Sequence, residues 1–148
     1  MLHPAATPGE GAHRYALRVY FEDTDAGGVV YHAGYLRFAE RARTEALRDL
    51  GVPHAEMTAL HGLMFMVRRI KVDYLGPARL DDSLVVVTEV LAVRAASVEL
   101  RQVVARADDP SRHLVVLEVL LAGVRNSDQR PGRIPPRWRE ALLSLSAD

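Results

Sequence analysis

The strongest constraint on the fold is one long helical pattern near the start of the chain. It is followed by several strand patterns that are joined by short links. The stretch AGYLRFAERARTEALRDLG predicts a helix that ends at Gly51, with Pro53 beyond it as a stop. Its apolar stripe is made mostly of small residues, which lets the helix lie close against a sheet: Tyr35, Ala39, Ala42 and Ala46. Charged pairs at helical spacing are expected on the outer side: Glu40–Arg43, Arg41–Glu45 and Glu45–Arg48.

Several segments have the character of β-strands. His13–Glu22 alternates apolar and polar residues, and further strands are predicted after the helix: Leu63–Tyr74, Ser83–Val93, Ser97–Asp108 and His113–Asn126. The links LGPARLDD, RAA and DDPSR are rich in turn-forming residues. Because short links join antiparallel neighbours, the chain is predicted to be an α+β domain with one antiparallel sheet and the long helix on one face. Short helices are also expected over His54–His61 and in PPRWREALLSL.

The strands Ser83–Val93 and His113–Asn126 are apolar on both faces of the predicted sheet, apart from Thr88, Glu89 and Glu118. One helix covers only one face, and a large exposed apolar patch usually marks a surface of association. We therefore expect other subunits to cover the outer faces of these strands. The expected assembly is a homo-oligomer, a dimer at least and by preference a tetramer of two dimers.

Composition excludes several classes of function. The 148 residues hold 19 basic and 19 acidic side chains, so the chain lacks the basic excess of a nucleic-acid-binding protein. No cysteine is present, which removes disulfides, thiolate metal sites and a cysteine nucleophile. Residues 1–12 do not have the features of a signal peptide and are predicted to form a mobile arm, with residues 13–148 as a single domain. No apolar run is long enough for a transmembrane segment, so we expect a cytoplasmic protein.

The unusual part of the sequence is the junction between the first strand and the long helix, YFEDTDAGGVVYHAGY. A calcium loop beginning at Asp23 would need a glutamate where the chain has Gly34. A Walker loop would need Gly-Lys-Ser/Thr, and the spacing of Asp23, Asp25 and His32 matches no familiar set of metal ligands, so no metal is expected. A plain turn and helix cap would also use Asp25 and the glycine pair. However, a carboxylate beside convergent N–H groups and the positive end of a helix suits the developing anion of acyl transfer.

The segment RVYFEDTDAGGVVYHAGYLRFAERARTE closely resembles the acyl-CoA thioesterases of the hotdog fold, of the 4-hydroxybenzoyl-CoA thioesterase type and nearest to the Tol-Pal-associated branch. The resemblance extends to Val72–Tyr74, to Leu80–Asp82 and to the strand order. It implies a strongly curved antiparallel sheet wrapped around one long central helix. It also implies hydrolysis of an acyl-CoA, with acyl carrier protein as another possible carrier, no cofactor and a homo-oligomer.

The same resemblance assigns roles to individual residues. It puts the catalytic carboxylate on Asp25, as nucleophile or as general base on water, and the oxyanion donor on the backbone N–H of His32. Tyr31 is expected beside the substrate, and Asp23 is expected only to brace the loop. Arg94, in the tight link between two strands, is expected to contact the CoA phosphates.

Other residues give weaker signals. Phe65 and Met66, within LMFMV, are candidates for the acyl pocket, although such residues more often belong to a plain core. His54 and His61 are expected at the surface. Two further functions stay open on the same fold: a dehydratase or hydratase in which a His and a carboxylate act as base and acid, and a non-catalytic module that binds acyl thioesters.

Overall fold

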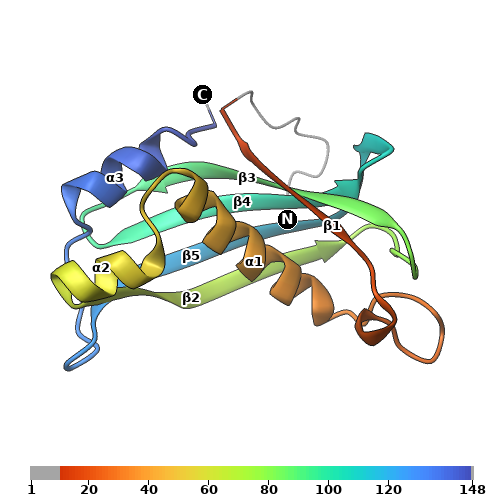
Figure 1. Cartoon of the computed structure of the whole chain (residues 1–148), viewed down its shortest axis with the longest axis horizontal. Coiled ribbons are helices and arrows are strands. Elements are labelled where there is room, and N and C mark those ends of the chain that lie inside the picture. Colours follow the sequence, from red (N-terminus) through yellow and green to blue (C-terminus); the bar gives the residue numbers. More distant parts are fainter. Residues whose placement is uncertain (1–10, 148) are drawn as a thin grey trace.

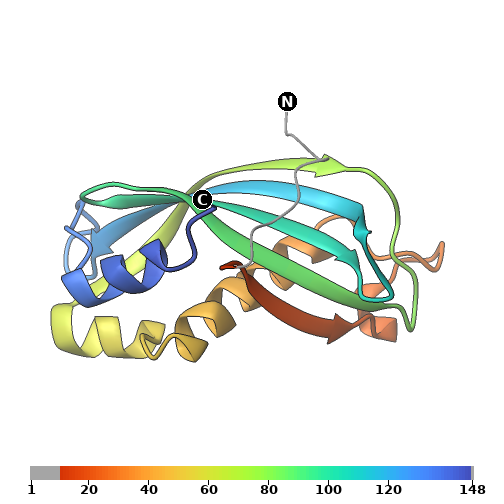
Figure 2. The same ribbon diagram turned by 90° about the horizontal axis from the view of Figure 1, so that it is seen from above.

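The computed structural model describes residues 11–147, in which one curved antiparallel sheet holds a long helix on its concave face (Figures 1 and 2). The arm predicted over residues 1–12 lies outside this range except for its last two residues. The elements are β1 His13–Arg18, the 3-10 turn η1 Phe21–Asp23, α1 Gly34–Asp49, α2 His54–His61, β2 Leu63–Tyr74, β3 Ser83–Val93, β4 Ser97–Arg106, β5 Asp109–Arg125 and α3 Pro136–Leu143. The predicted α+β class and hotdog architecture are confirmed.

The strand order in the sheet is β1-β3-β4-β5-β2, and every neighbouring pair is antiparallel. β2 therefore forms one edge and is joined to the sheet only through β5. Exposed apolar side chains stand along this edge strand: Met64, Val67 and Tyr74. A long edge of this kind leaves backbone N–H and C=O groups ready to pair with another chain.

Four strand ends differ from the sequence prediction, and two of them, the end of β4 at Arg106 and the end of β5 at Arg125, differ by only one or two residues. The first strand ends at Arg18, because the chain then turns into η1, where the Asp23 carboxylate accepts the N–H of Tyr20 (2.8 Å). β5 begins at Asp109, before the predicted start, although Pro110 has no N–H to donate. β2 has already ended beside this part of β5, so the proline stands on a free edge where a missing donor costs little.

The core lies between α1 and the concave face of the sheet. The predicted stripe of α1 is buried as expected, with Ala39 and Ala42 fully enclosed. Trp138 of α3 is also fully buried and donates its indole N–H to the Val52 carbonyl (3.0 Å), so α3 packs back on the domain. Among residues 11–147, no helix has both the length and the apolar character needed to cross a bilayer.

The convex face of the sheet is divided between apolar and charged rows. A small second cluster of buried side chains stands there: Val103, Ala105 and Val116. A row of alternating charges crosses adjacent strands beside it: Glu89, Arg101, Glu118 and Lys71. This face is less apolar than β3 and β5 alone suggest, because β4 and β2 contribute the cations.

Candidate active site

The segment between η1 and α1 closes into a tight turn that presents Asp25, at the lower right of Figure 1. The Asp25 N–H donates to the Val29 carbonyl (2.9 Å), and the Gly28 N–H donates to the Asp25 carbonyl (3.0 Å). Gly28 has a φ of +77°, where a side chain would be strained, so the turn requires glycine at this position. Gly28 thus has a structural reason, and the turn it allows holds Asp25 in place.

The Asp25 side chain is exposed and uses only one of its oxygens. Oδ1 accepts the N–H of Gly27 (2.8 Å), which fixes the direction of the carboxylate. Within the described part of the chain, Oδ2 accepts no hydrogen bond. An oriented carboxylate with a free oxygen is suited to act as a nucleophile or as a base on water.

Asp23 has a different environment from Asp25, although it stands only two residues earlier. It is buried, and its carboxylate accepts the N–H of Tyr20 (2.8 Å). Its backbone carbonyl accepts the N–H of Tyr31 (3.0 Å). Asp23 therefore ties the two ends of the loop together.

The start of α1 offers unpaired backbone donors beside this turn. The N–H of Val30 is used by the Ala78 carbonyl and that of Tyr31 by Asp23. The next two N–H groups, those of His32 and Ala33, find no acceptor in residues 11–147, and no side chain caps the helix. Unpaired N–H groups at the positive end of a helix are a ready site for an anion.

Tyr74, from the end of β2, holds one of these peptide groups in place. Its hydroxyl donates to the His32 carbonyl (2.9 Å). Because a peptide unit is planar and trans, this carbonyl and the N–H of Ala33 point in opposite directions. Tyr74 thus fixes the direction of the Ala33 N–H and polarises it. In the sequence, Tyr74 stands out only through the family resemblance of Val72–Tyr74, since a contact across 42 residues leaves no local pattern.

The side chains of Tyr31 and His32 lie together on the surface next to the turn. Their ring centroids are 4.4 Å apart, and the His32 ring also meets the Tyr74 ring edge-on. The His32 ring makes no hydrogen bond within residues 11–147, to Asp25 or to any other group. What His32 offers to the site is therefore its backbone and an aromatic surface.

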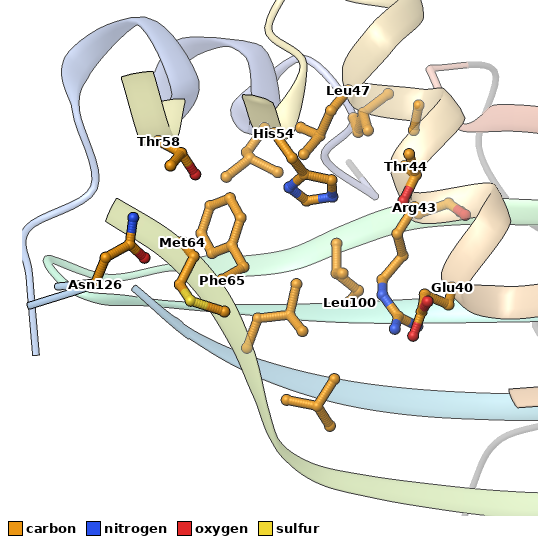
Figure 3. A pocket seen from close by; sticks show the side chains of 16 residues that line it. Glu40, Arg43, Thr44, Leu47, His54, Thr58, Met64, Phe65, Leu100 and Asn126 are labelled. Atoms are coloured by element: carbon orange, nitrogen blue, oxygen red, sulfur yellow. The ribbon is translucent and has the colours of Figure 1, made fainter. Parts of the chain in front are cut away.

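A cavity of about 490 Å³ lies between α1, α2, α3 and the sheet (Figure 3). Phe65 is part of its lining, as predicted for an acyl pocket, and Met66 is not. His54 also lines it, against the expectation of a surface position, with its ring packed on Phe65. Burial, and then the positive charge of Arg43, lower the pKa of His54 below its ordinary value, so this ring is neutral at pH 7.

The position of Arg43 also differs from the sequence prediction. It was expected on the outer side of the helix in a pair with Glu40, and it is instead buried beside the cavity. Arg43 follows Ala39 by one helical turn, so it shares the inward side of α1. Among the predicted pairs of this helix, an ion pair forms between Glu45 and Arg48 (3.3 Å from Oε2 to Nε).

Within one chain, the turn with Asp25 and the cavity lie toward opposite ends of α1. The turn precedes Gly34, whereas the cavity is lined by α1 from Glu40 to Leu47 and by α2 beyond it. A helix of 16 residues is about 24 Å long. Figure 1 shows the turn at one end of α1 and α2 at the other.

Arg94 lies in the hairpin between β3 and β4. Its backbone N–H closes the turn on the Ser97 carbonyl (2.8 Å). Its exposed guanidinium pairs with Glu99 (3.3 Å from Nη1 to Oε1). No group of three His, Asp or Glu residues in the described region is arranged to hold a metal ion.

Known proteins resemble this chain over most of its length. Residues 27–112 match the family model of the thioesterase superfamily. The chain is 44% identical over 124 residues to acyl-CoA thioester hydrolase YbgC of Escherichia coli. The matched region covers 82% of this chain and 89% of that protein. It is 35% identical over 135 residues to acyl-CoA thioesterase YbgC of Helicobacter pylori, over 86% of this chain and 98% of that one. A crystal structure of a probable thioesterase from Bartonella henselae superposes with a TM-score of 0.76 at 33% identity, over 84% of this chain and 99% of that chain.

Fold, sequence and relatives therefore agree on the class of protein, a thioester hydrolase of the hotdog fold. The chain belongs to the thioesterase superfamily, and within it the chain is similar to the YbgC proteins. The predicted family and enzyme class are confirmed.

Proposed function

We propose that this protein hydrolyses acyl-CoA to the free acid and CoA. The observation that carries the proposal is that the free oxygen of Asp25 and the unpaired N–H groups of His32 and Ala33 belong to one short segment between η1 and α1. The names of the YbgC relatives support CoA as the carrier, and acyl carrier protein is a second carrier to test. A cytoplasmic location and an association with the Tol-Pal system belong to the same proposal and rest on the branch that the chain resembles.

In this mechanism Asp25 either attacks the thioester carbonyl to form a mixed anhydride or takes a proton from the water that attacks. In both routes the carbonyl oxygen becomes an oxyanion facing the N–H groups of His32 and Ala33. One such donor is worth about 3 kcal/mol of transition-state stabilisation. The leaving thiol has a pKa of about 8.5, so a strong general acid is not needed.

The proposal is tested by thiol release from a panel of acyl-CoAs, from short aliphatic to aromatic and long-chain. Thiol release from at least one class is expected. Tight binding without thiol release would instead favour the binding module. A lyase would need the His32 ring as an acid–base partner of Asp25, and the absence of a hydrogen bond between them gives that reading no support.

The separation of Asp25 from the cavity suggests how the site is completed. The acyl group must lie next to the carboxylate, yet in one chain the two stand toward opposite ends of α1. The edge strand β2 runs between the same two regions, with Met64 and Phe65 at the cavity and Tyr74 at the helix start. We propose that two copies pair antiparallel along β2 about a twofold axis. Such a dimer sets the cavity of one copy next to Asp25 of the other.

A tetramer would add contacts through the convex face of the sheet. Within the charged row Glu89 is buried and pairs with Arg101, whereas Lys71 is exposed and Glu118 is half-buried, so these last two suit contacts with opposite charges of a second copy. Dimer and tetramer are distinguished by light scattering in high and low salt, because only contacts between exposed charges weaken with ionic strength.

Removal of the Tyr74 hydroxyl is expected to slow turnover. Tyr74→Phe keeps the ring but frees the His32 carbonyl, so the Ala33 N–H loses its fixed direction. We expect kcat to fall about 10-fold with little change in KM, as for a lost contribution to oxyanion binding. Tyr15→Phe is the matched control, because the Tyr15 hydroxyl makes no hydrogen bond within residues 11–147. Equal kcat values for the two variants would contradict this role.

Arg94 is expected to act on binding alone. Arg94→Ala should raise KM for acyl-CoA roughly 3- to 10-fold and leave kcat nearly constant, since a phosphate contact is made equally in ground and transition states. An acyl pantetheine, which lacks the nucleotide, should show little change. Glu99→Gln should lower KM, because it releases Arg94 from its ion pair. A similar loss with both substrates would mean that Arg94 does not contact the nucleotide.

A further inference from the structure

Arg43 is a buried cation without an acidic partner. The residue is 8% exposed, and no carboxylate in residues 11–147 lies within ion-pair distance of it. Burial of a charge is costly unless it is paired, and here burial lowers the pKa of Arg43. Glu40, one turn earlier, raises that pKa, but burial has the larger effect. A cation kept in this position needs a reason.

One side of the guanidinium is fixed by a buried polar network. Nη1 donates to Oε1 of Gln102 (3.0 Å), and Gln102 is itself fully buried. The amide nitrogen of Gln102 donates to the Ala39 carbonyl (2.9 Å) and to the Thr88 hydroxyl (3.0 Å). The network holds Arg43 rigidly, so its position costs no further ordering when a ligand binds.

The other side of the guanidinium is unused. A guanidinium carries five N–H donors, and the described residues supply one acceptor for Arg43. Arg43 lines the cavity, where Figure 3 shows it reaching from α1 toward the space between helix and sheet. Around it the lining is mainly apolar, with Leu47, Phe65 and Leu100. An apolar pocket with a few fixed polar groups has the usual make-up of a small-molecule site.

We propose that Arg43 binds a negatively charged oxygen at the far end of the acyl group, so that the cavity selects acyl chains that end in a carboxylate. The inference rests on the proposed function, since it names the substrate class of that site. Neutral His54 adds no charge of its own to the cavity. Glu40 also lines the cavity, but it is exposed, and water screens its repulsion of an anion more strongly than it screens the attraction of the buried Arg43.

The test compares two substrates of equal chain length, adipoyl-CoA and hexanoyl-CoA, which differ in a terminal carboxylate against a terminal methyl group. Thiol release gives kcat/KM for each, and their ratio is the measured quantity. We expect the wild-type ratio to favour adipoyl-CoA at least ~10-fold, since hydrogen bonds to charged groups contribute about 1.5–3 kcal/mol. Arg43→Gln keeps a donor for Gln102 and removes the charge, and it should lower this ratio at least ~10-fold. Arg43→Lys should retain part of the preference.

Two controls separate this role from a structural one. Arg41→Gln removes an exposed arginine of the same helix and should leave the ratio unchanged. Binding of the same two esters to the Asp25→Asn protein, measured by calorimetry, gives the comparison without turnover. A wild-type ratio near one, or an equal loss on both substrates in Arg43→Gln with a lowered Tm, would overturn the inference and leave the proposed function intact. If the wild-type protein released thiol from neither these esters nor the wider panel, the proposed function would fail, and the calorimetric ratio would still decide the role of Arg43.

Discussion

Asp25→Asn is expected to lower kcat for acyl-CoA at least ~100-fold while fold, assembly and substrate affinity are kept. The amide oxygen of asparagine can still accept the Gly27 N–H, so the turn keeps its shape. What is lost is the charge of the carboxylate and its free oxygen, which serve either as nucleophile or as base. The measurement is thiol release under saturating substrate, with circular dichroism and light scattering as checks on structure.

The matched control for this substitution stands in the same loop. Asp23→Asn replaces a buried carboxylate by an amide whose oxygen can still accept the Tyr20 N–H, but as a weaker, uncharged hydrogen bond, so we expect a loss of stability of about 1 kcal/mol and a small loss of kcat. If Asp23→Asn were inactive and Asp25→Asn hydrolysed acyl-CoA at near wild-type rate, the catalytic carboxylate would be Asp23 and not Asp25. If both were active, the carboxylate mechanism itself would be refuted.

Much of the fold was predictable because its signals are local. β2 and β3 begin and end at the predicted residues, since alternation and turn chemistry mark both ends of each strand. The inward stripe of α1 was predicted in the same way. The early start of β5 was not, because Pro110 normally excludes a strand, and only the position of β2 in the folded sheet makes it tolerable.

The site was predictable in part, through one contiguous motif. The turn at Asp25 and the unpaired N–H of His32 lie within a single short segment, so the sequence carries both. The prediction for Arg43 was wrong because its position in the sequence fits two sides of the helix. It follows Glu40 at pairing distance on the outer side, and it follows Ala39 by one turn on the inner side, so only packing of the helix determines which side it takes. The Tyr74 contact and the cavity join segments far apart in the chain, which no local pattern records.

The separation of carboxylate and cavity in one chain leads to the last prediction, which concerns complementation between two inactive variants. One carries Asp25→Asn. The other carries Thr44→Trp, which fills part of the cavity from α1, with Thr58→Trp on α2 as a second choice. Each homo-oligomer should have little activity, because every site lacks either its carboxylate or its pocket.

Co-expression with two affinity tags and tandem purification yields the mixed dimer. If each site combines the cavity of one copy with Asp25 of the other, the mixed dimer holds one site with both defects and one with neither. It should then recover about half of the wild-type activity per dimer, a rise of at least ~50-fold over the Asp25→Asn protein if that variant retains about 1%. If carboxylate and cavity acted within a single chain, each chain of the mixed dimer would carry one defect and no activity would return. Recovery requires that the cavity and the Asp25 of one site come from different chains. This one measurement therefore tests the composite site and, with it, the pairing along β2 that would build it.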